Sequence, residues 1–155
     1  VPWTGLQKAR SVPPIHDITT DTRDPPGFVA LLQARLEAPN GAEYGGDDIA
    51  RQQREAYPDV QPLDLDLAPG PAFDRALAAA RAMGWDIVDT DPANGRIEAT
   101  ATTFWYGFKD DVVVRVRPEG GGSRIDVRSM SRVGASDVGA NAERIRRYLA
   151  RVERS

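Results

Sequence analysis

Apolar and polar residues alternate along much of the second half of the chain. Leu63 and Leu65 alternate with aspartates, and the run from Val112 to Val116 places every second valine on one side. A period of two is the signature of a β-strand with one buried face. The pattern predicts five strands, over residues 63–67, 85–90, 96–104, 110–117 and 123–130.

Two other stretches show the spacing of an amphipathic helix. One contains Phe73, Leu77, Ala80 and Met83 and ends at Gly84, and the other runs from Val138 to Val152. Apolar residues three or four positions apart form one helical face, and glycine commonly ends a helix. Shorter helices are predicted over residues 28–36, with Asp24 as the cap, and over residues 49–57.

The order of these elements is β-α-β-β-β-β-α, with short hairpin turns such as the one at Asn94 and Gly95. Such turns join antiparallel neighbours. The sequence therefore predicts an α+β fold in which an antiparallel sheet of about five strands carries two main helices on one face. We expect a single domain, with residues 60–155 as its core and residues 1–59 as a strap-like extension. Residues 15–21 either add an edge strand or lie along the surface.

The same alternation places charged and polar side chains on the opposite face of the predicted sheet. These residues are Asp111, Arg115, Arg117, Asp126 and Arg128, with Glu98, Thr100 and Thr102 beside them. One interpretation is a solvated face with ion pairs between strands. The other is that the N-terminal extension folds over this face and forms a polar groove. The sequence leaves both open.

A cluster of arginines and serines follows, where the last strand leads into the last helix. The start of a helix offers free amides and a partial positive charge, which suit an anion. Asn141 and Arg144 point toward the same end. The predicted ligand-binding residues are Arg115, Arg128, Ser129, Ser131, Arg132, Asn141 and Arg144. The alternative is ordinary capping by Ser136 or Asp137, with the arginines exposed to solvent.

Candidate catalytic chemistry is sparse. His16 is the only histidine, and no Gly-x-Ser-x-Gly motif is present. The alternative to a binding domain is a hydrolase in which His16, Asp21 and Asp111 meet in a groove. Asp110 and Asp111 are adjacent in a strand and point to opposite sides, so they make a poor metal pair. We therefore expect no metal and no cofactor.

Composition narrows the function classes further. The net charge of −3 argues against a general nucleic-acid binder. The absence of cysteine excludes disulfides and thiolate zinc sites. No apolar run reaches the roughly 20 residues that a membrane helix needs. Because the chain begins at Val1, we expect it to be a piece of a longer protein, whose upstream part can hold a membrane anchor.

Several longer motifs resemble a bacterial family known as DUF1499, a domain of unknown function. The motifs are Pro14 to Asp21, Ala56 to Asp59, Met83 to Trp85, Phe108 to Asp111, Asp126 to Gly134 and Asp137 to Ile145. The resemblance covers nearly the whole chain and implies no catalytic residues. It implies a place in the cell envelope, on the periplasmic face of a membrane.

These observations lead to one main hypothesis about function. We expect a non-catalytic envelope domain that binds a protein partner or a small anion near residues 129–132. The hydrolase is the alternative from another class, and a structural spacer without a ligand is the third interpretation. No nucleic-acid partner is expected, and a membrane is reached only through an upstream anchor.

Overall fold

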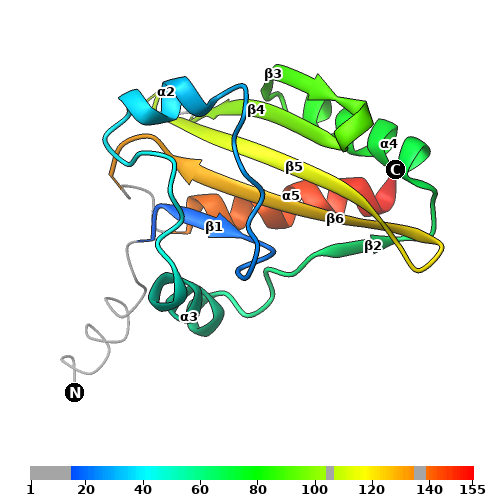
Figure 1. The fold of residues 1–155 in the computed structure, drawn as a ribbon, viewed down its shortest axis with the longest axis horizontal. Coiled ribbons are helices and arrows are strands. Elements are labelled where there is room, and N and C mark those ends of the chain that lie inside the picture. Colours follow the sequence, from blue (N-terminus) through cyan, green and yellow to red (C-terminus); the bar gives the residue numbers. More distant parts are fainter. Residues whose placement is uncertain (1–14, 104–106, 135–138) are drawn as a thin grey trace.

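An antiparallel sheet of six strands organises the part of the chain that the structure describes (Figure 1). The computed structural model describes residues 15–103, 107–134 and 139–155. The strands are β1 (Asp17–Thr19), β2 (Leu63–Leu65), β3 (Asp86–Asp91), β4 (Arg96–Thr102), β5 (Lys109–Glu119) and β6 (Gly122–Ser131). They lie in the order β1-β6-β5-β4-β3, and β2 also pairs with β6. The predicted α+β fold is confirmed, and the sixth strand comes from the N-terminal extension.

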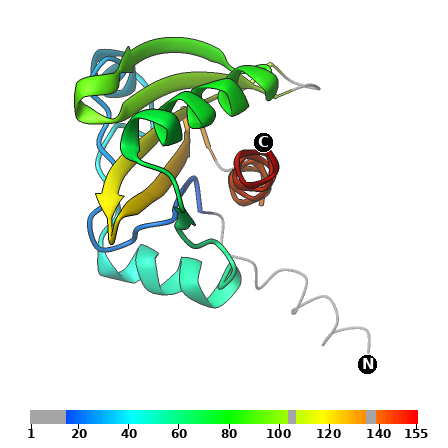
Figure 2. The ribbon, with the colours of Figure 1, turned by 90° about the vertical axis from the view of Figure 1, so that its right-hand side faces the viewer.

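The helices of the described residues are α2 (Leu32–Glu37), α3 (Asp47–Ala56), α4 (Pro69–Ala82) and α5 (Ala140–Arg154), with a short 3-10 helix, η1 (Pro92–Asn94). Helices α4 and α5 lie together on one side of the sheet, as predicted (Figure 2). The inward side chains of β4, β5 and β6 pack against them as the main core. Tyr148 of α5 is fully buried there and donates a hydrogen bond to the Ala76 carbonyl of α4.

Local sequence explains where some of these elements begin and end. Pro69 lies at the start of α4, where the first amides of a helix need no partner and proline is well tolerated. Gly95 follows η1 with a φ of 66°. A Cβ at this position would collide with the Val116 carbonyl, so only glycine fits this turn.

The opposite face of the sheet is covered by the chain between β1 and α3. Residues 20–31 cross in front of β6 and β5, and α2 lies over one end of β5 (Figure 1). Several polar residues of this face are therefore buried: Glu98, Asp111 and Asp126 are each 0% exposed and Arg128 is 3% exposed. Arg115 and Arg117 are partly exposed, and Thr102 is exposed. Of the two interpretations of this face, the extension does fold over it, but what it forms there is a buried polar layer.

Helix α2 begins later than its sequence pattern suggests. The amides of Val29, Ala30 and Leu31 all donate hydrogen bonds to the Glu98 carboxylate, at 2.8–3.1 Å. The amides before Leu32 thus find their hydrogen-bond partner in a side chain of β4, so this segment does not need to be helical to satisfy them. The predicted start at residue 28 and the predicted Asp24 cap are wrong, because the N-cap position is Leu31 and it makes no side-chain cap.

Candidate functional site

The edge of the sheet beside β6 is built from two short strands that do not meet. β1 pairs with residues 128–130 of β6 and β2 pairs with residues 123–125. Thr20 lies in the interval: its amide donates to the Val127 carbonyl at 3.0 Å and its hydroxyl to Asp126 at 2.6 Å. The chain turns away from the sheet edge after Thr20, and a hollow is left between the two strands.

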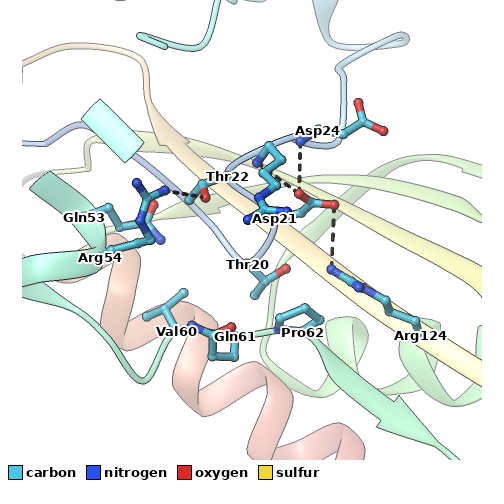
Figure 3. Close-up of a pocket in the computed structure, with 11 residues that line it drawn as sticks. Thr20, Asp21, Thr22, Asp24, Gln53, Arg54, Val60, Gln61, Pro62 and Arg124 are labelled. Carbon is cyan, nitrogen blue, oxygen red and sulfur yellow. Dashed lines mark hydrogen bonds and ion pairs between the residues drawn. The ribbon is translucent and has the colours of Figure 1, made fainter. Parts of the chain in front are cut away.

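This hollow is a polar cleft of about 630 Å³. Its walls come from three parts of the chain: the turn after β1, helix α3 and the segment before β2, with β6 at one end (Figure 3). The lining residues are Thr20, Asp21, Thr22, Arg23, Asp24, Gln53, Arg54, Val60, Gln61, Pro62 and Arg124. We call it the edge cleft.

Asp21 is the acidic centre of one wall. Its carboxylate accepts hydrogen bonds from the amides of Arg23 and Asp24, and it lies 3.1 Å from Arg115 and 3.7 Å from Arg124. Burial raises the pKa of Asp21, but those amide hydrogen bonds and the two guanidinium charges outweigh burial and hold the pKa below its usual value. Asp21 is therefore a paired carboxylate at neutral pH.

The charges behind this wall form a balanced cluster. Arg115, Arg117 and Arg124 lie within 4 Å of Asp21 and Asp126, and the first two also lie 3.8 Å from Asp24. Three guanidiniums thus face three carboxylates. The cluster leaves little net charge of its own at the edge cleft.

Two further arginines of the edge cleft are not part of this balance. Neither Arg23 nor Arg54 has a carboxylate within 4 Å among the described residues. Arg54 donates a hydrogen bond to the Thr22 hydroxyl at 3.1 Å, which holds its head against the opposite wall (Figure 3). These two guanidiniums give the edge cleft an excess of positive charge.

The frame that carries Arg54 is fixed by its neighbour. Gln53 is 2% exposed and its amide side chain bonds both backbone groups of Thr19, accepting from the amide at 3.0 Å and donating to the carbonyl at 2.7 Å. These two hydrogen bonds have the pattern that a residue of a neighbouring strand would form, and they attach α3 to β1. The edge cleft is therefore held open by the fold itself.

The predicted ligand-binding residues do not come together in one place. Arg115, Arg128 and Arg132 lie on the face that residues 20–44 cover, whereas Ser129 and Ser131 face the helices. Alternation along β6 separates them, because neighbours on a strand point to opposite faces. Only Arg115 borders the edge cleft, through Asp21.

Arg128 is occupied by the protein. It makes a bidentate pair with Asp17 at 2.8–2.9 Å, donates to the carbonyls of Pro26 and Ala42, and stacks 5.1 Å from the centre of the Phe28 ring. A planar guanidinium suits this combination of stacking and forked bonding. Arg128 thus holds the extension to the sheet.

Arg132 belongs to a second buried ion group. It makes a bidentate contact of 2.9–3.0 Å with Asp111, which also pairs with the fully buried Arg35 at 3.2 Å. Arg35 comes from α2 and donates further bonds to the carbonyls of Gly41, Met130 and Ser131. One carboxylate of β5 therefore anchors both α2 and the end of β6.

The remaining predicted residues form a closed network under the start of α5. Arg144 lies 2.8 Å from Asp110 and donates to the Asn141 side chain, whose oxygen also accepts from Ser129 at 2.7 Å. Asn141 in turn donates to Ser131 at 2.9 Å. The N-cap position of α5 is Gly139, without a side-chain cap. The predicted caps Ser136 and Asp137 lie outside the described residues.

The three residues of the hydrolase alternative lie in separate surroundings. Asp21 contacts Arg115 and Asp111 contacts Arg35, and the positions of Arg115 and Asp111 on β5 are four residues, or about 13 Å, apart. The backbone carbonyl of His16 accepts a hydrogen bond from the Ser131 amide at 2.8 Å. Asp21 and Asp111 thus belong to separate ion groups, and no hydrogen bond or ion pair joins His16 to either carboxylate among the described residues.

Sequence reasoning missed most of the edge cleft. Gln53, Arg54 and Arg124 show no motif, because their sharing of one cleft depends on how α3 packs beside β6. The one available signal was the β-branched, polar run that ends at Asp21, which was recognised as an edge-strand candidate. Among the described residues, no group of three His, Asp or Glu side chains is placed to hold a metal ion.

No helix in the described ranges combines the length and the apolar character needed to span a membrane. Three of the solved structures that match part of the chain do so at low similarity. CalU16 from Micromonospora echinospora is 14% identical, with a TM-score of 0.42, over 59% of this chain and 72% of its own. TTHA0849 from Thermus thermophilus is 11% identical, with a TM-score of 0.35, over 60% and 94%. Ara h 8.0201 is 13% identical, with a TM-score of 0.31, over 61% and 96%.

No curated protein matches the chain. A family profile does match it, from β1 almost to the end of α5, and its description is "Protein of unknown function (DUF1499)". The match spans residues 17–152, so it includes both the extension that covers the sheet and the helices on the other side. The chain belongs to the DUF1499 family.

Proposed function

We propose that this domain is a non-catalytic binding module that takes a small anionic ligand in the edge cleft. The observation that carries the proposal is the pair Arg23 and Arg54, two exposed guanidiniums that line the cleft without a carboxylate partner in the described part of the chain. The proposal keeps the small anion expected from the sequence and moves its site from residues 129–132 to the sheet edge.

The chemistry of the lining supports an anion with several oxygens. Guanidiniums donate forked hydrogen bonds that fit a carboxylate or a phosphate group. The Thr22 hydroxyl and the Gln61 amide are further polar groups of the same lining. A carboxylate or phosphate group between Arg23 and Arg54 would replace water on both and neutralise their charge.

The state of the acidic residues supports binding over catalysis. A general acid or base works best when its pKa is near the working pH. Burial raises the pKa of Asp21, but two backbone amides and the arginine charges hold that pKa below its usual value. Asp21 therefore stays charged at neutral pH and pairs with Arg115 and Arg124, which suits a structural carboxylate better than a general acid or base.

The location of the protein is a further part of the proposal. The family resemblance implies the cell envelope, with any anchor lying upstream of this chain. Fractionation of cells that express the full-length protein tests this: recovery in the soluble cytoplasmic fraction would contradict it.

Isothermal titration of the purified chain with inorganic phosphate and with succinate tests the binding proposal. The double variant R23E/R54E should weaken the binding of the preferred anion at least about tenfold, because each hydrogen bond to a charged group contributes about 1.5–3 kcal/mol. The two probes separate a phosphate ligand from a carboxylate ligand. Sodium chloride at equal ionic strength measures the non-specific part.

The matched control is R147E/R151E, which reverses two exposed arginines on α5 that also lack a carboxylate partner in the described ranges. It changes the net charge equally but lies outside the edge cleft. Equal loss of binding in both variants, or no saturable binding of either anion by the wild type, would contradict the proposal.

A further inference from the structure

A row of arginines runs along one flank of α5, far in sequence from the edge cleft. Arg147, Arg151 and Arg154 are spaced by four and three residues, so they lie on the same side of the helix. All three are exposed, and none has a carboxylate within 4 Å among the described residues. The chain as a whole carries −3, so this flank opposes the overall charge.

The row borders a groove between α5 and the end of α4. One hollow of about 380 Å³ is lined by Ala82, Met83, Arg147, Ala150, Arg151 and Arg154. A second hollow, of about 330 Å³, shares Met83 and Arg147 with the first and continues past Trp85. We call the two together the α4–α5 groove.

The two walls of the groove differ in chemistry. The α5 wall carries the guanidiniums, with one carboxylate, Glu143, in the second hollow. Ala82 and Met83 at the end of α4 present small and flexible apolar side chains. Like charges four residues apart on a helix repel each other, so an anion between Arg147 and Arg151 would relieve their repulsion. A partner with carboxylates on one side and apolar groups on the other would complement both walls.

The spacing of the arginines indicates the form of that partner. Arg147 and Arg151 are about 6 Å apart along the helix axis. In an extended peptide, side chains on one side repeat about every 6.6 Å, and those between them point the opposite way. An extended segment with acidic residues at alternate positions would place its carboxylates on the arginines and its other side chains toward Met83.

We propose that the α4–α5 groove binds an extended acidic segment of a partner protein. A hollowed surface fits a peptide better than it fits the broad plane of a lipid bilayer. The proposal stands on different residues from the edge cleft and does not depend on the small anion proposed there.

Fluorescence anisotropy with a fluorescein-labelled peptide of alternating glutamate and alanine tests the proposal on the whole chain. The wild type should bind it saturably and should not bind the matching lysine–alanine peptide. R147E/R151E should weaken binding at least about tenfold, in line with the loss of two charge-assisted hydrogen bonds. R23E/R54E, with the same change in net charge, should leave peptide binding unchanged.

Three results would contradict the proposal that the α4–α5 groove binds an acidic segment. These are equal weakening in both double variants, no saturable binding by the wild type, or stronger binding to phosphatidylcholine vesicles containing phosphatidylglycerol than to the peptide. If circular dichroism shows that R147E/R151E is not folded, R147Q/R151Q gives the same test, because it removes the two charges without reversing them. Because the two double variants act on separate sites, loss of anion binding in one leaves the peptide result interpretable in the other.

Discussion

Both faces of this sheet are covered, but the chemistry of the two covers differs. Toward α4 and α5, the strands present Val112, Val114 and Ile97 to an apolar core. Toward residues 20–44, the same strands present Asp111 and Glu98, which are fully buried among arginines and backbone amides. The helix face is held by the removal of apolar surface from water. The extension face combines paired charges with a small apolar cluster of Phe28, Leu31, Val113 and Met130.

The comparison shows what each kind of contact does for the fold. Apolar packing is tolerant of exchange, because residues of similar volume replace one another at small cost. A buried charge needs its particular partner, so Asp17, Glu98 and Asp111 fix where the extension lies on the sheet. The edge cleft depends on that placement, because one of its walls is residues 20–24.

The largest effect is expected on the extension face, from Asp111→Ala. This change leaves Arg35 buried without its carboxylate and also releases Arg132, which should lower the free energy of unfolding by about 3–5 kcal/mol. Urea unfolding at neutral pH measures it. Asp48→Ala removes an exposed ion pair with Arg51 and should leave the midpoint unchanged. Similar midpoints for the two variants would contradict the buried-charge account.

On the helix face, Ile145→Ala should lower the free energy of unfolding by about 2–5 kcal/mol, because it leaves a cavity in the core. The loss should be the same at low and high salt, since no charge is involved. A strong salt dependence of the Ile145→Ala effect would remove the distinction between the two faces.

Glu98→Gln is expected to loosen the extension locally. The neutral amide accepts fewer and weaker hydrogen bonds from Val29, Ala30 and Leu31, and the loss should be about 1.5–3 kcal/mol. Faster hydrogen exchange at these amides, with unchanged exchange in β5, would show that the effect stays on this face. Uniform acceleration across both faces would show that it does not.

Asp21 should contribute to the pH dependence of the free energy of unfolding at acidic pH. Its pKa is lower in the folded chain than its ordinary value of 3.8, so the contribution is present above about pH 4 and is lost as the pH falls through the lowered value. Unfolding of the wild type and Asp21→Asn, measured across this range, should give a difference that shrinks on acidification. A difference that grows on acidification would contradict the assigned direction.

The smallest effect is expected from Tyr44→Phe. Burial, with the charge of Asp17, raises the pKa of Tyr44 to about 12, and the buried hydroxyl has no hydrogen-bond partner in the described structure. At neutral pH the variant should be as stable as the wild type or slightly more so. From about pH 10 to 12 the wild type loses the stability that the neutral phenol gives, and the variant should lose less. A larger alkaline loss in Tyr44→Phe would contradict this.

The two faces also differ in how far the sequence reveals them. Alternation along β5 and β6 placed Val112, Val114 and Val127 correctly, because a period of two fixes which side chains share a face. The same period placed Asp111 and Arg128 on the other face but left their burial undetermined. Arg35 lies 76 residues from Asp111 in sequence, and no local pattern connects them.

The candidate sites were hidden for a related reason. Arg54 is one of several polar residues on a short helix, and only its packing against β1 through Gln53 brings it to the edge cleft. The arginines of α5 lie outside the apolar stripe of that helix, on the side that an amphipathic helix exposes. Their lack of carboxylate partners among the described residues became visible only with the fold.

Residues 20–44 form a fixed layer of this fold, joined to the sheet by buried charges and by the apolar contacts of Phe28 and Leu31. Native-state hydrogen exchange at the amides of Val29, Ala30 and Leu31 tests it most directly. We expect protection comparable to that of the β4–β5 ladder, because these amides are bonded to the buried Glu98 carboxylate. Exchange as fast as that of exposed turn amides such as Gly120 would contradict it.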